Sequence, residues 1–254
     1  MIDLHCHILP GLDDGAANDV EALRMAEELL AEGVDTVVAT PHVGGVYALG
    51  AAAIQWETEH CQELFTRHGL PLRLLPGGEI AMRGDTLALW RRGILPNLGG
   101  GPARVLLLEL PSLFLAEGAR RLIEECVAME TVVVIAHPER NPALMRDPKL
   151  VETLRYAGAR FQITAASLDG QFGQTAQNFA ELLLRQRMVD YVASDLHPGR
   201  SVSLKKAAKR IKKLCGQEMA DRVLQKNPND LFIDQVWMPA LTQWPDSIPI
   251  VKTA

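Results

Sequence analysis

Short apolar runs alternate with amphipathic stretches along the chain. The runs, rich in leucine or β-branched residues, occupy positions 1–5, 34–40, 72–76, 104–110, 131–136, 159–164 and 189–194. The stretch 19–32 has the apolar spacing of a helix, and Gly33 is placed to end it. Repeated alternation of strand and helix predicts an α/β protein with a parallel sheet. A closed or nearly closed barrel is one way to bury both faces of that sheet.

The length of 254 residues suits one large α/β domain, because barrels of this class commonly reach about 250 residues. We therefore expect a single domain over residues 1–254. From about residue 228 the chain is rich in proline and tryptophan, and we expect this tail, 228–254, to wrap the domain.

The formal net charge is −5, which argues against nucleic-acid binding. The basic run 205–213 has apolar residues at helical spacing and predicts a solvated helix face. The longest apolar stretch, 105–116, contains Glu109 and Pro111 and is too short to cross a bilayer. The four cysteines are scattered along the chain without a C-x-x-C motif, which fits reduced thiols rather than a disulfide framework. Cys6 is expected to pack in the core. These features predict a cytoplasmic protein without membrane insertion.

The segment "DLHCH" at residues 3–7 places His5 and His7 on one face of the first predicted strand. A His-x-His pair alone is frequently a chance feature, so its meaning depends on the rest of the chain. Further His, Asp and Glu side chains follow this strand and five other predicted strands, at the edge where parallel barrels assemble their active sites. These further candidates are Asp13, Asp14, His42, Glu79, Glu109, His137, Asp195 and His197.

Taken singly, a carboxylate such as Asp13 could cap a helix or lie on the surface. Glu109, however, lies inside an apolar strand, where an ionised carboxylate is costly unless it meets a cation. Together the candidates predict a metal site. Imidazoles and carboxylates without thiolates point to Mn, Fe, Zn or Mg in a hydrolytic site. The candidates are too many for one ion and enough for two or three, and adjacent ions would share a bridging carboxylate and a hydroxide.

The motifs "DLHCH", "TPH", "GGEI", "LEL", "AHPER" and "SDLH" follow one another in this order over essentially the whole chain. As a set they resemble the polymerase and histidinol phosphatase (PHP) superfamily. The segments "MIDLHCHILPGLDDGA", "HPER" and "SDLHPGR" are similar to the bacterial manganese-dependent protein-tyrosine phosphatases of capsule and exopolysaccharide synthesis. The resemblance implies a distorted (β/α)7 barrel with three metal ions, most simply Mn²⁺, at the C-terminal ends of the strands. It implies a first ion held by His5, His7, Glu79 and Asp195, with Glu79 bridging, a second held by Asp14, His42 and His197, and a third held by Glu79, Glu109 and His137.

Two arginines complete the predicted chemistry. Arg140 and Arg200 each lie three residues after a candidate ligand and match the phosphate-binding arginines of the resembled family. A guanidinium offers a planar set of donors that suits phosphate oxygens, whereas a structural salt bridge is the competing interpretation. The expected reaction is hydrolysis of a phosphate monoester by a metal-bridging hydroxide, without a covalent intermediate. The segment 44–56 is expected to receive an aromatic ring of the substrate, with Tyr47 as the contact.

The resemblance implies a protein-tyrosine phosphatase whose substrate and partner is a phosphotyrosine protein, in particular a bacterial tyrosine kinase of polysaccharide synthesis. A histidinol-phosphate phosphatase of the same superfamily is the first alternative, although that branch tends to carry imidazoles at the positions of Asp14 and Glu109. A noncatalytic or DNA-associated metal module is the second alternative. The full set of candidate ligands argues against a degenerate site.

Overall fold

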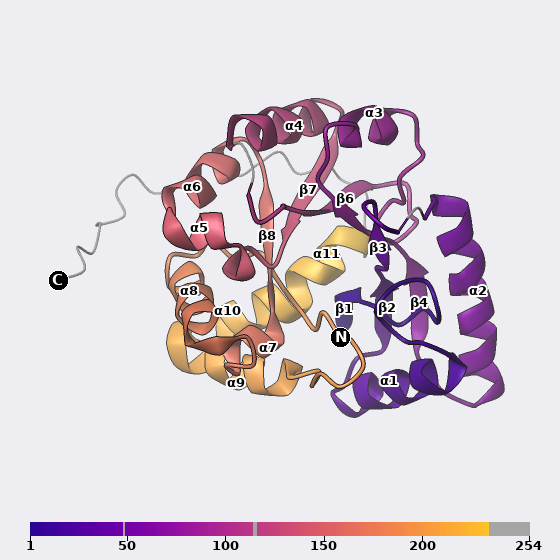
Figure 1. Ribbon diagram of the computed structural model, residues 1–254. Coiled ribbons are helices and arrows are strands. Elements are labelled where there is room, and N and C mark those ends of the chain that lie inside the picture. The colour runs from indigo at the N-terminus through magenta and orange to yellow at the C-terminus, as the bar shows by residue number, and fades with distance from the viewer. Residues whose placement is uncertain (48, 114–115, 234–254) are drawn as a thin grey trace.

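The computed structural model describes residues 1–47, 49–113 and 116–233, in which strands and helices alternate (Figure 1). The strands are β1 (Ile2–Cys6), β2 (Thr36–Ala39), β3 (His42–Val43), β4 (Arg73–Pro76), β5 (Glu79–Ala81), β6 (Arg104–Glu109), β7 (Thr131–Ala136), β8 (Arg160–Thr164) and β9 (Tyr191–Ala193). The helices are α1 (Asp19–Ala31), α2 (Ala51–Arg67), α3 (Thr86–Arg91), α4 (Ala116–Ala128), η1 (Pro138–Arg140), α5 (Pro142–Arg146), α6 (Lys149–Tyr156), α7 (Ala165–Leu168), α8 (Gly173–Arg185), α9 (Leu204–Cys215), α10 (Gln217–Asp221), η2 (Arg222–Lys226) and α11 (Asn227–Ile233). The expected α/β class is confirmed. No helix within the described ranges has the length and apolar character needed to cross a membrane.

All neighbouring strands pair in parallel, as the alternating pattern predicts, but they form two sheets. One sheet has the order β1-β2-β4 and the other the order β3-β5-β6-β7-β8-β9. The end of β1 lies beside the segment after β9, where the backbone N–H of His7 donates to the carbonyl of Leu196 over 3.1 Å. Strand pairing is thus interrupted rather than continuous around the interior, which is the form that the expected barrel distortion takes.

The interruption arises because two strands of the barrel are each broken into two pieces. One is divided into β2 and β3, and the other into β4 and β5. Pro41 separates the first pair and has no N–H to donate. Gly77 and Gly78 separate the second pair in a tight space: a Cβ on Gly78 would lie 2.5 Å from Cγ of Pro96. His42 and Glu79 therefore do not simply follow a strand, as the sequence pattern suggested. They begin β3 and β5 and are direct partners in the parallel register.

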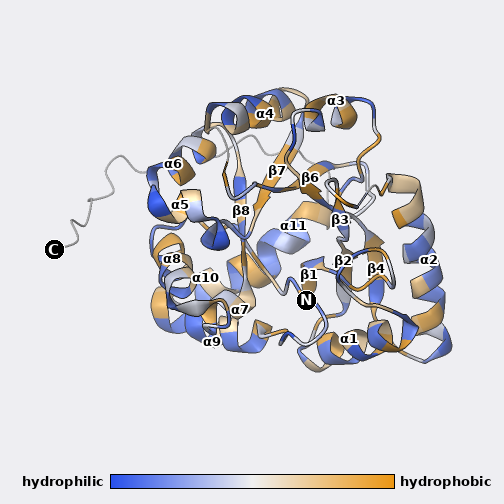
Figure 2. Cartoon of the chain, viewed as in Figure 1, coloured by the Kyte–Doolittle hydropathy of each residue, from blue (hydrophilic) through white to orange (hydrophobic). Residues whose placement is uncertain are grey.

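The apolar interior is divided into two clusters. The outer cluster lies between the strands and the surrounding helices and includes Leu29 of α1 and Phe65 of α2. The inner cluster is formed by alternate strand residues and includes Leu4, Val38, Val105, Leu107, Val134, Ala136, Tyr191 and Ala193. Figure 2 shows the result, with largely hydrophobic strands surrounded by helices of mixed character. Because both faces of the strands are buried, the strands read as nearly continuous apolar runs in the sequence.

The helix α11 closes the end of the barrel at which the strands begin. Leu231 packs into the inner cluster, and the amide of Asn227 donates to the carbonyl of Asp190, immediately before β9, over 2.8 Å. The ring of Phe232 lies where a Cβ on Gly99 would stand. The expected wrapping tail thus starts as a packed helix over its first residues. Residues 234–254 of that tail lie outside the described residues.

Candidate metal centre

A β-bulge in β1 directs the first two histidines into the barrel. The register runs from Asp3 opposite Val37 to Cys6 opposite Ala39, so β1 has one residue more than β2 over this interval. Simple alternation from Leu4 in the inner cluster would point Cys6 inward, yet Cys6 belongs to the outer cluster. The extra residue reverses the alternation. His5 and His7 therefore face the interior, and the expected packing role of Cys6 is confirmed.

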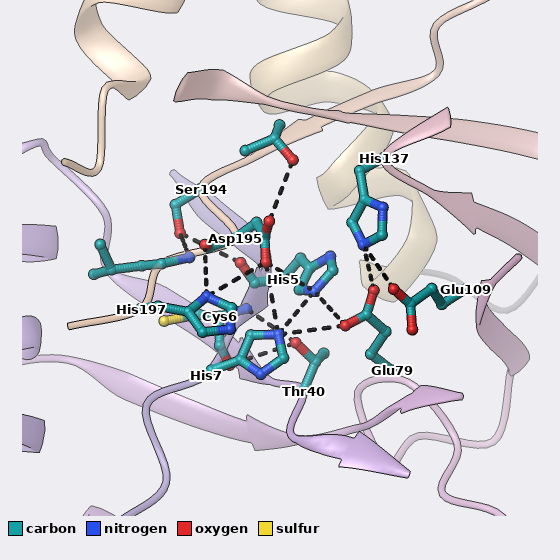
Figure 3. Close-up of polar contacts among 12 residues, drawn as sticks. His5, Cys6, His7, Thr40, Glu79, Glu109, His137, Ser194, Asp195 and His197 are labelled. Atoms are coloured by element: carbon teal, nitrogen blue, oxygen red, sulfur yellow. Dashed lines mark hydrogen bonds and ion pairs between the residues drawn. The ribbon is translucent and has the colours of Figure 1, made fainter. Parts of the chain in front are cut away.

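Four donor atoms converge beside the bulge (Figure 3). Nε2 of His5 and Nε2 of His7 lie 3.1 Å apart. Oε2 of Glu79 lies 3.4 Å and 3.5 Å from these two nitrogens, and Oδ1 of Asp195 lies 3.4 Å and 3.6 Å from them. Both oxygens are buried and have no hydrogen-bond partner among the described residues. Buried carboxylate oxygens without a donor are costly, and a cation would satisfy both at once, so these residues fit a metal ion.

Two further groups of donors adjoin this one. Oδ1 of Asp14 lies 3.4 Å from Nε2 of both His42 and His197. Nε2 of His137 lies 2.6 Å from Oε1 of Glu79 and 3.9 Å from Oε1 of Glu109. Within each of four overlapping sets the donor atoms lie within 4.8 Å of one another. The sets are His7, Asp14, His42 and His197; His5, His7 and Asp195; His5, Glu79 and His137; and His42, Glu79 and Glu109. All nine ligands expected from the resemblance are thus brought to one end of the barrel, and their coordination of ions stays a prediction.

Asp13 and Gln162 hold the two central imidazoles in orientation. Nδ1 of His7 lies 2.6 Å from Oδ2 of Asp13, and Nδ1 of His5 lies 2.8 Å from Oε1 of Gln162. A proton on each Nδ1 leaves each Nε2 with a lone pair aimed at the centre, the usual arrangement behind a metal-binding histidine. Asp13 was a candidate from the sequence without this role, whereas Gln162 was missed. Its signal is an uncharged polar residue between two apolar residues in the middle of β8, the only predicted strand that supplies no candidate ligand.

The charges of the site favour a cation. Burial opposes ionisation of Glu79, but the imidazoles of His5 and His137 outweigh it and hold the pKa of Glu79 well below its usual range. Burial likewise opposes ionisation of Asp195, but His5 and Arg140 bring its pKa down to about 2. Burial disfavours the charged form of His7, yet its hydrogen bond with Asp13 and the nearby carboxylate of Glu79 raise its pKa to about 10. Without an ion, protons on imidazoles balance these carboxylates, and a bound metal ion would take their place.

Arg140 and Arg200 lie at the rim of the donor cluster. Nη1 of Arg140 is 2.9 Å from Oδ2 of Asp195, and Nη1 of Arg200 is 3.5 Å from the same oxygen and 3.0 Å from Nδ1 of His197. Both guanidiniums are partly exposed. The structure therefore contains the structural salt bridges that were the competing interpretation, and both are made to Oδ2 of Asp195. Each guanidinium has further N–H donors that these contacts do not use. Tyr47 stacks on His42 with ring centroids 5.7 Å apart, so it lies beside the cluster as expected.

One sequence feature is typical of a different chemistry, hydrolysis by a cysteine nucleophile. The segment 61–67, "CQELFTR", has the C-x5-R spacing of cysteine-dependent tyrosine phosphatases. In the structure it lies inside α2 rather than in a phosphate-binding loop. Cys61 is buried in the outer cluster, and burial raises the pKa of its thiol to about 12. Residues six apart on a helix project in different directions, so Cys61 and Arg67 form no active site.

The comparison with known proteins decides the family. A family model described as capsular polysaccharide synthesis, CpsB/CapC, matches residues 1–233. The chain belongs to the CpsB/CapC family. It is 35% identical over 198 residues to the tyrosine-protein phosphatase YwqE of Bacillus subtilis (strain 168), an alignment that covers 78% of this chain and 77% of YwqE. It is 26% identical over 244 residues to the tyrosine-protein phosphatase CpsB of Streptococcus pneumoniae, covering 93% of this chain and 100% of CpsB.

Membership of the CpsB/CapC family is supported by the fold as well. A solved structure matches this chain with a TM-score of 0.88 and 31% identity, covering 94% of this chain and 97% of the other. It belongs to a set of crystal structures of YwqE from Bacillus subtilis and CpsB from Streptococcus pneumoniae, described as unique metal-dependent tyrosine phosphatases. The resemblance inferred from the motifs is thus confirmed. The CpsB/CapC match spans every described element from β1 to α11 and includes all nine expected ligands.

Proposed function

We propose that this protein is a metal-dependent protein-tyrosine phosphatase that acts within bacterial capsular or exopolysaccharide synthesis. The observation that carries the proposal is the convergence of His5 Nε2 and His7 Nε2 on two buried carboxylate oxygens that form no hydrogen bond with a described residue, one from Glu79 and one from Asp195. This cluster lies in a chain similar to YwqE, itself named a tyrosine-protein phosphatase. The names of the relatives support the substrate class, and the cluster supports the dependence on metal.

We assign the nine ligands to two or three ions, with Glu79 shared between them, as the motifs imply. Manganese is our first choice because nitrogen and carboxylate donors without thiolate suit it, and Fe, Zn or Mg remain compatible with the same donors. Ions bound there would supply an activated water and positive charge for a phosphate monoester. Asp13 and Gln162 would keep the Nε2 atoms of His7 and His5 directed at the ions.

The substrate phosphate is assigned to Arg140 and Arg200. Each guanidinium uses Nη1 to contact Asp195 and retains in-plane donors for phosphate oxygens, whose charge increases in the transition state. A cavity of about 280 Å³ opens beside Arg140 and α5, and its lining includes Glu109 and His137 together with further polar and apolar residues. Tyr47, which stacks on His42, offers a flat wall for the phenolic ring. A phenolate leaves readily because its conjugate acid has a pKa of about 10.

The physiological substrate proposed here is a phosphotyrosine protein, in particular a tyrosine kinase of the polysaccharide-synthesis system, encountered in the cytoplasm. The free cysteines are compatible with a reducing compartment, since Cys6, Cys61 and Cys126 are buried as thiols. The capsular polysaccharide description of the matching family supports the cellular process.

The test compares phosphate release from a phosphotyrosyl peptide and from histidinol phosphate. The protein is stripped with chelator, divided, and reloaded with manganese, iron, zinc or magnesium, and its metal content is measured by elemental analysis. We expect more than one metal equivalent per chain, no activity in the stripped sample and a clear preference for the phosphotyrosyl peptide. A preference for histidinol phosphate would contradict the tyrosine-phosphatase assignment and favour a small-molecule phosphatase of the same superfamily. Hydrolysis of neither substrate by fully loaded protein would favour the noncatalytic module.

A further inference from the structure

Phe172 lies against both of the arginines assigned to phosphate. The Cζ atom of Arg140 stands 4.6 Å from the centre of the Phe172 ring, and the Cζ atom of Arg200 stands 5.5 Å from it. The three residues come from three separate segments, because Arg140 ends η1, Arg200 follows β9 and Phe172 immediately precedes α8. We propose that Phe172 is a positioning residue that holds the two guanidiniums as a pair for the phosphate of the substrate. This inference rests on the proposed function of that site.

The geometry suits such a role because of how a guanidinium uses its surfaces. Its five N–H donors lie in its own plane, and its faces make no hydrogen bonds. Contact with an aromatic ring occupies a face and attracts the positive charge without using any donor. Arg140 and Arg200 are both also drawn to Oδ2 of Asp195. Each guanidinium is therefore held at its edge by Asp195, with Nδ1 of His197 as a further contact of Arg200, and is also held by Phe172, while its other donors stay available.

The loop that carries Phe172 is fastened to the segment that carries Arg200. Asp169, three residues before Phe172, accepts a hydrogen bond from Nζ of Lys206 over 2.8 Å. The side-chain amide of Gln171 donates to Oγ of Ser203 over 2.9 Å. These two contacts, from the residues directly before the ring, bind the α7–α8 loop to the start of α9. Phe172 is thereby fixed relative to Arg200 before any substrate binds, which is what a positioning residue requires.

Other arginine–aromatic pairs in the described residues differ in kind. Arg155 lies over Phe161, and Arg104 lies over Trp90, each pair with one arginine and away from the donor cluster. Phe172 is the one described ring that has two arginines over it, and both are the arginines that the motifs single out. A ring that only packed against the aliphatic part of an arginine side chain would have no reason to contact both of these arginines. The shared ring also keeps two like charges close together next to the site.

The experiment compares Phe172→Leu with Phe172→Tyr and Phe172→Trp, which keep the aromatic face. Phe179→Leu is the matched control, because Phe179 lies in the same helix region but is buried in the outer cluster. Each manganese-loaded variant is analysed for metal content, and its affinity for inorganic phosphate is measured by calorimetry. Hydrolysis of the phosphotyrosyl peptide is measured in parallel. Phosphate binding does not depend on which ester is the substrate, so failure of the proposed substrate and failure of this inference give different results.

We expect Phe172→Leu to weaken phosphate binding and to lower kcat/KM by about 5- to 30-fold, the size of two modest cation–π contacts, with metal content unchanged. Phe172→Tyr and Phe172→Trp should restore most of the loss, and Phe179→Leu should bind phosphate as wild type does. In a background that lacks both guanidiniums, Arg140→Ala with Arg200→Ala, the leucine change should have no further effect on kcat/KM. The inference is overturned if Phe172→Leu binds phosphate normally, if it loses metal, if the tyrosine and tryptophan variants are as weak as leucine, or if the wild type binds no phosphate.

Discussion

Asp13→Asn tests whether the orientation of His7, rather than a direct bond to metal, explains the buried carboxylate of Asp13. The side chain of Asp13 is fully buried. Its Oδ2 accepts from Nδ1 of His7 over 2.6 Å and from the backbone N–H of His42 over 2.9 Å. Its Oδ1 accepts from the backbone N–H of Gly15 over 2.9 Å. Three N–H donors thus face the two oxygens of Asp13. The ionised carboxylate carries no hydrogen that would need an acceptor.

An asparagine at this position has one oxygen where the carboxylate has two. In either orientation of the amide, its NH2 group faces at least one of the three N–H groups, and that group loses its acceptor. The unfolding free energy of the metal-free protein should fall by about 1–3 kcal/mol, the cost of a buried polar group left unpaired. The bond from His7 to a charged acceptor is lost as well. We therefore expect metal affinity at the His5–His7 position to fall by about 10- to 100-fold, as for other partners of metal-binding histidines.

Asp14→Asn provides the matched control at the adjacent position. The side chain of Asp14 is 54% exposed, and its Oδ1 contacts His42 and His197 rather than His7. This variant should weaken a different ion while changing the stability of the stripped protein by less than about 0.5 kcal/mol. Urea unfolding in the presence of chelator gives the stability, and competition with a fluorescent chelator gives the affinity of each manganese ion. If Asp13→Asn binds every ion as tightly as wild type, the orienting role is refuted. Complete loss of one ion by Asp13→Asn alone would mean that Asp13 is itself a ligand.

The remaining predictions concern other parts of the molecule. Arg140→Ala and Arg200→Ala should keep their metal and lose about 10- to 1000-fold in kcat/KM, whereas Glu79→Ala should lose metal and activity together; elemental analysis beside steady-state kinetics separates the two behaviours. Cys61→Ser should retain the kcat of the loaded enzyme, and an inactive but folded and loaded Cys61→Ser protein would contradict hydrolysis without a cysteine nucleophile. Leu231→Ala should lower the unfolding free energy by about 2–5 kcal/mol without changing kcat, because α11 packs at the end of the barrel opposite the site; unchanged stability in urea titrations would disprove that packing.

Much of the fold and the members of the site could be predicted from local pattern. Apolar runs separated by amphipathic stretches identify seven strands, β1, β2, β4, β6, β7, β8 and β9, within a residue or two of their observed bounds. The rule that parallel strands present their carboxyl ends at one edge then gathers the candidates without knowledge of any distance. The nine expected ligands came together in the structure for this reason. Their residue types are distinctive because ionisable side chains are rare inside buried strands.

The breaks and the bulge could not be predicted in the same way. Pro41 and Gly78 are visible as breakers, but whether a strand resumes after them depends on the neighbours it finds, here β5 and β6 for the short strands β3 and β5. The bulge in β1 is a mismatch in count between β1 and β2, so neither segment contains it alone. Period-two alternation correctly placed His5 and His7 together, and yet it carried no information about which face of the barrel that would be.

The orienting residues show why a search limited to charged residues ends too early. Gln162 carries no charge and looks like any polar residue that ends up in a strand. Its role appears only once register is known, because it pairs with Ala136 on β7 and Tyr191 on β9, two members of the inner cluster, and so must itself point inward. An uncharged amide in that position has to find a partner, and the partner available is Nδ1 of His5, 2.8 Å away. The same physical requirement that makes a buried polar residue costly therefore makes it informative: inside a barrel, a lone glutamine among apolar neighbours indicates a group that needs to be held in place.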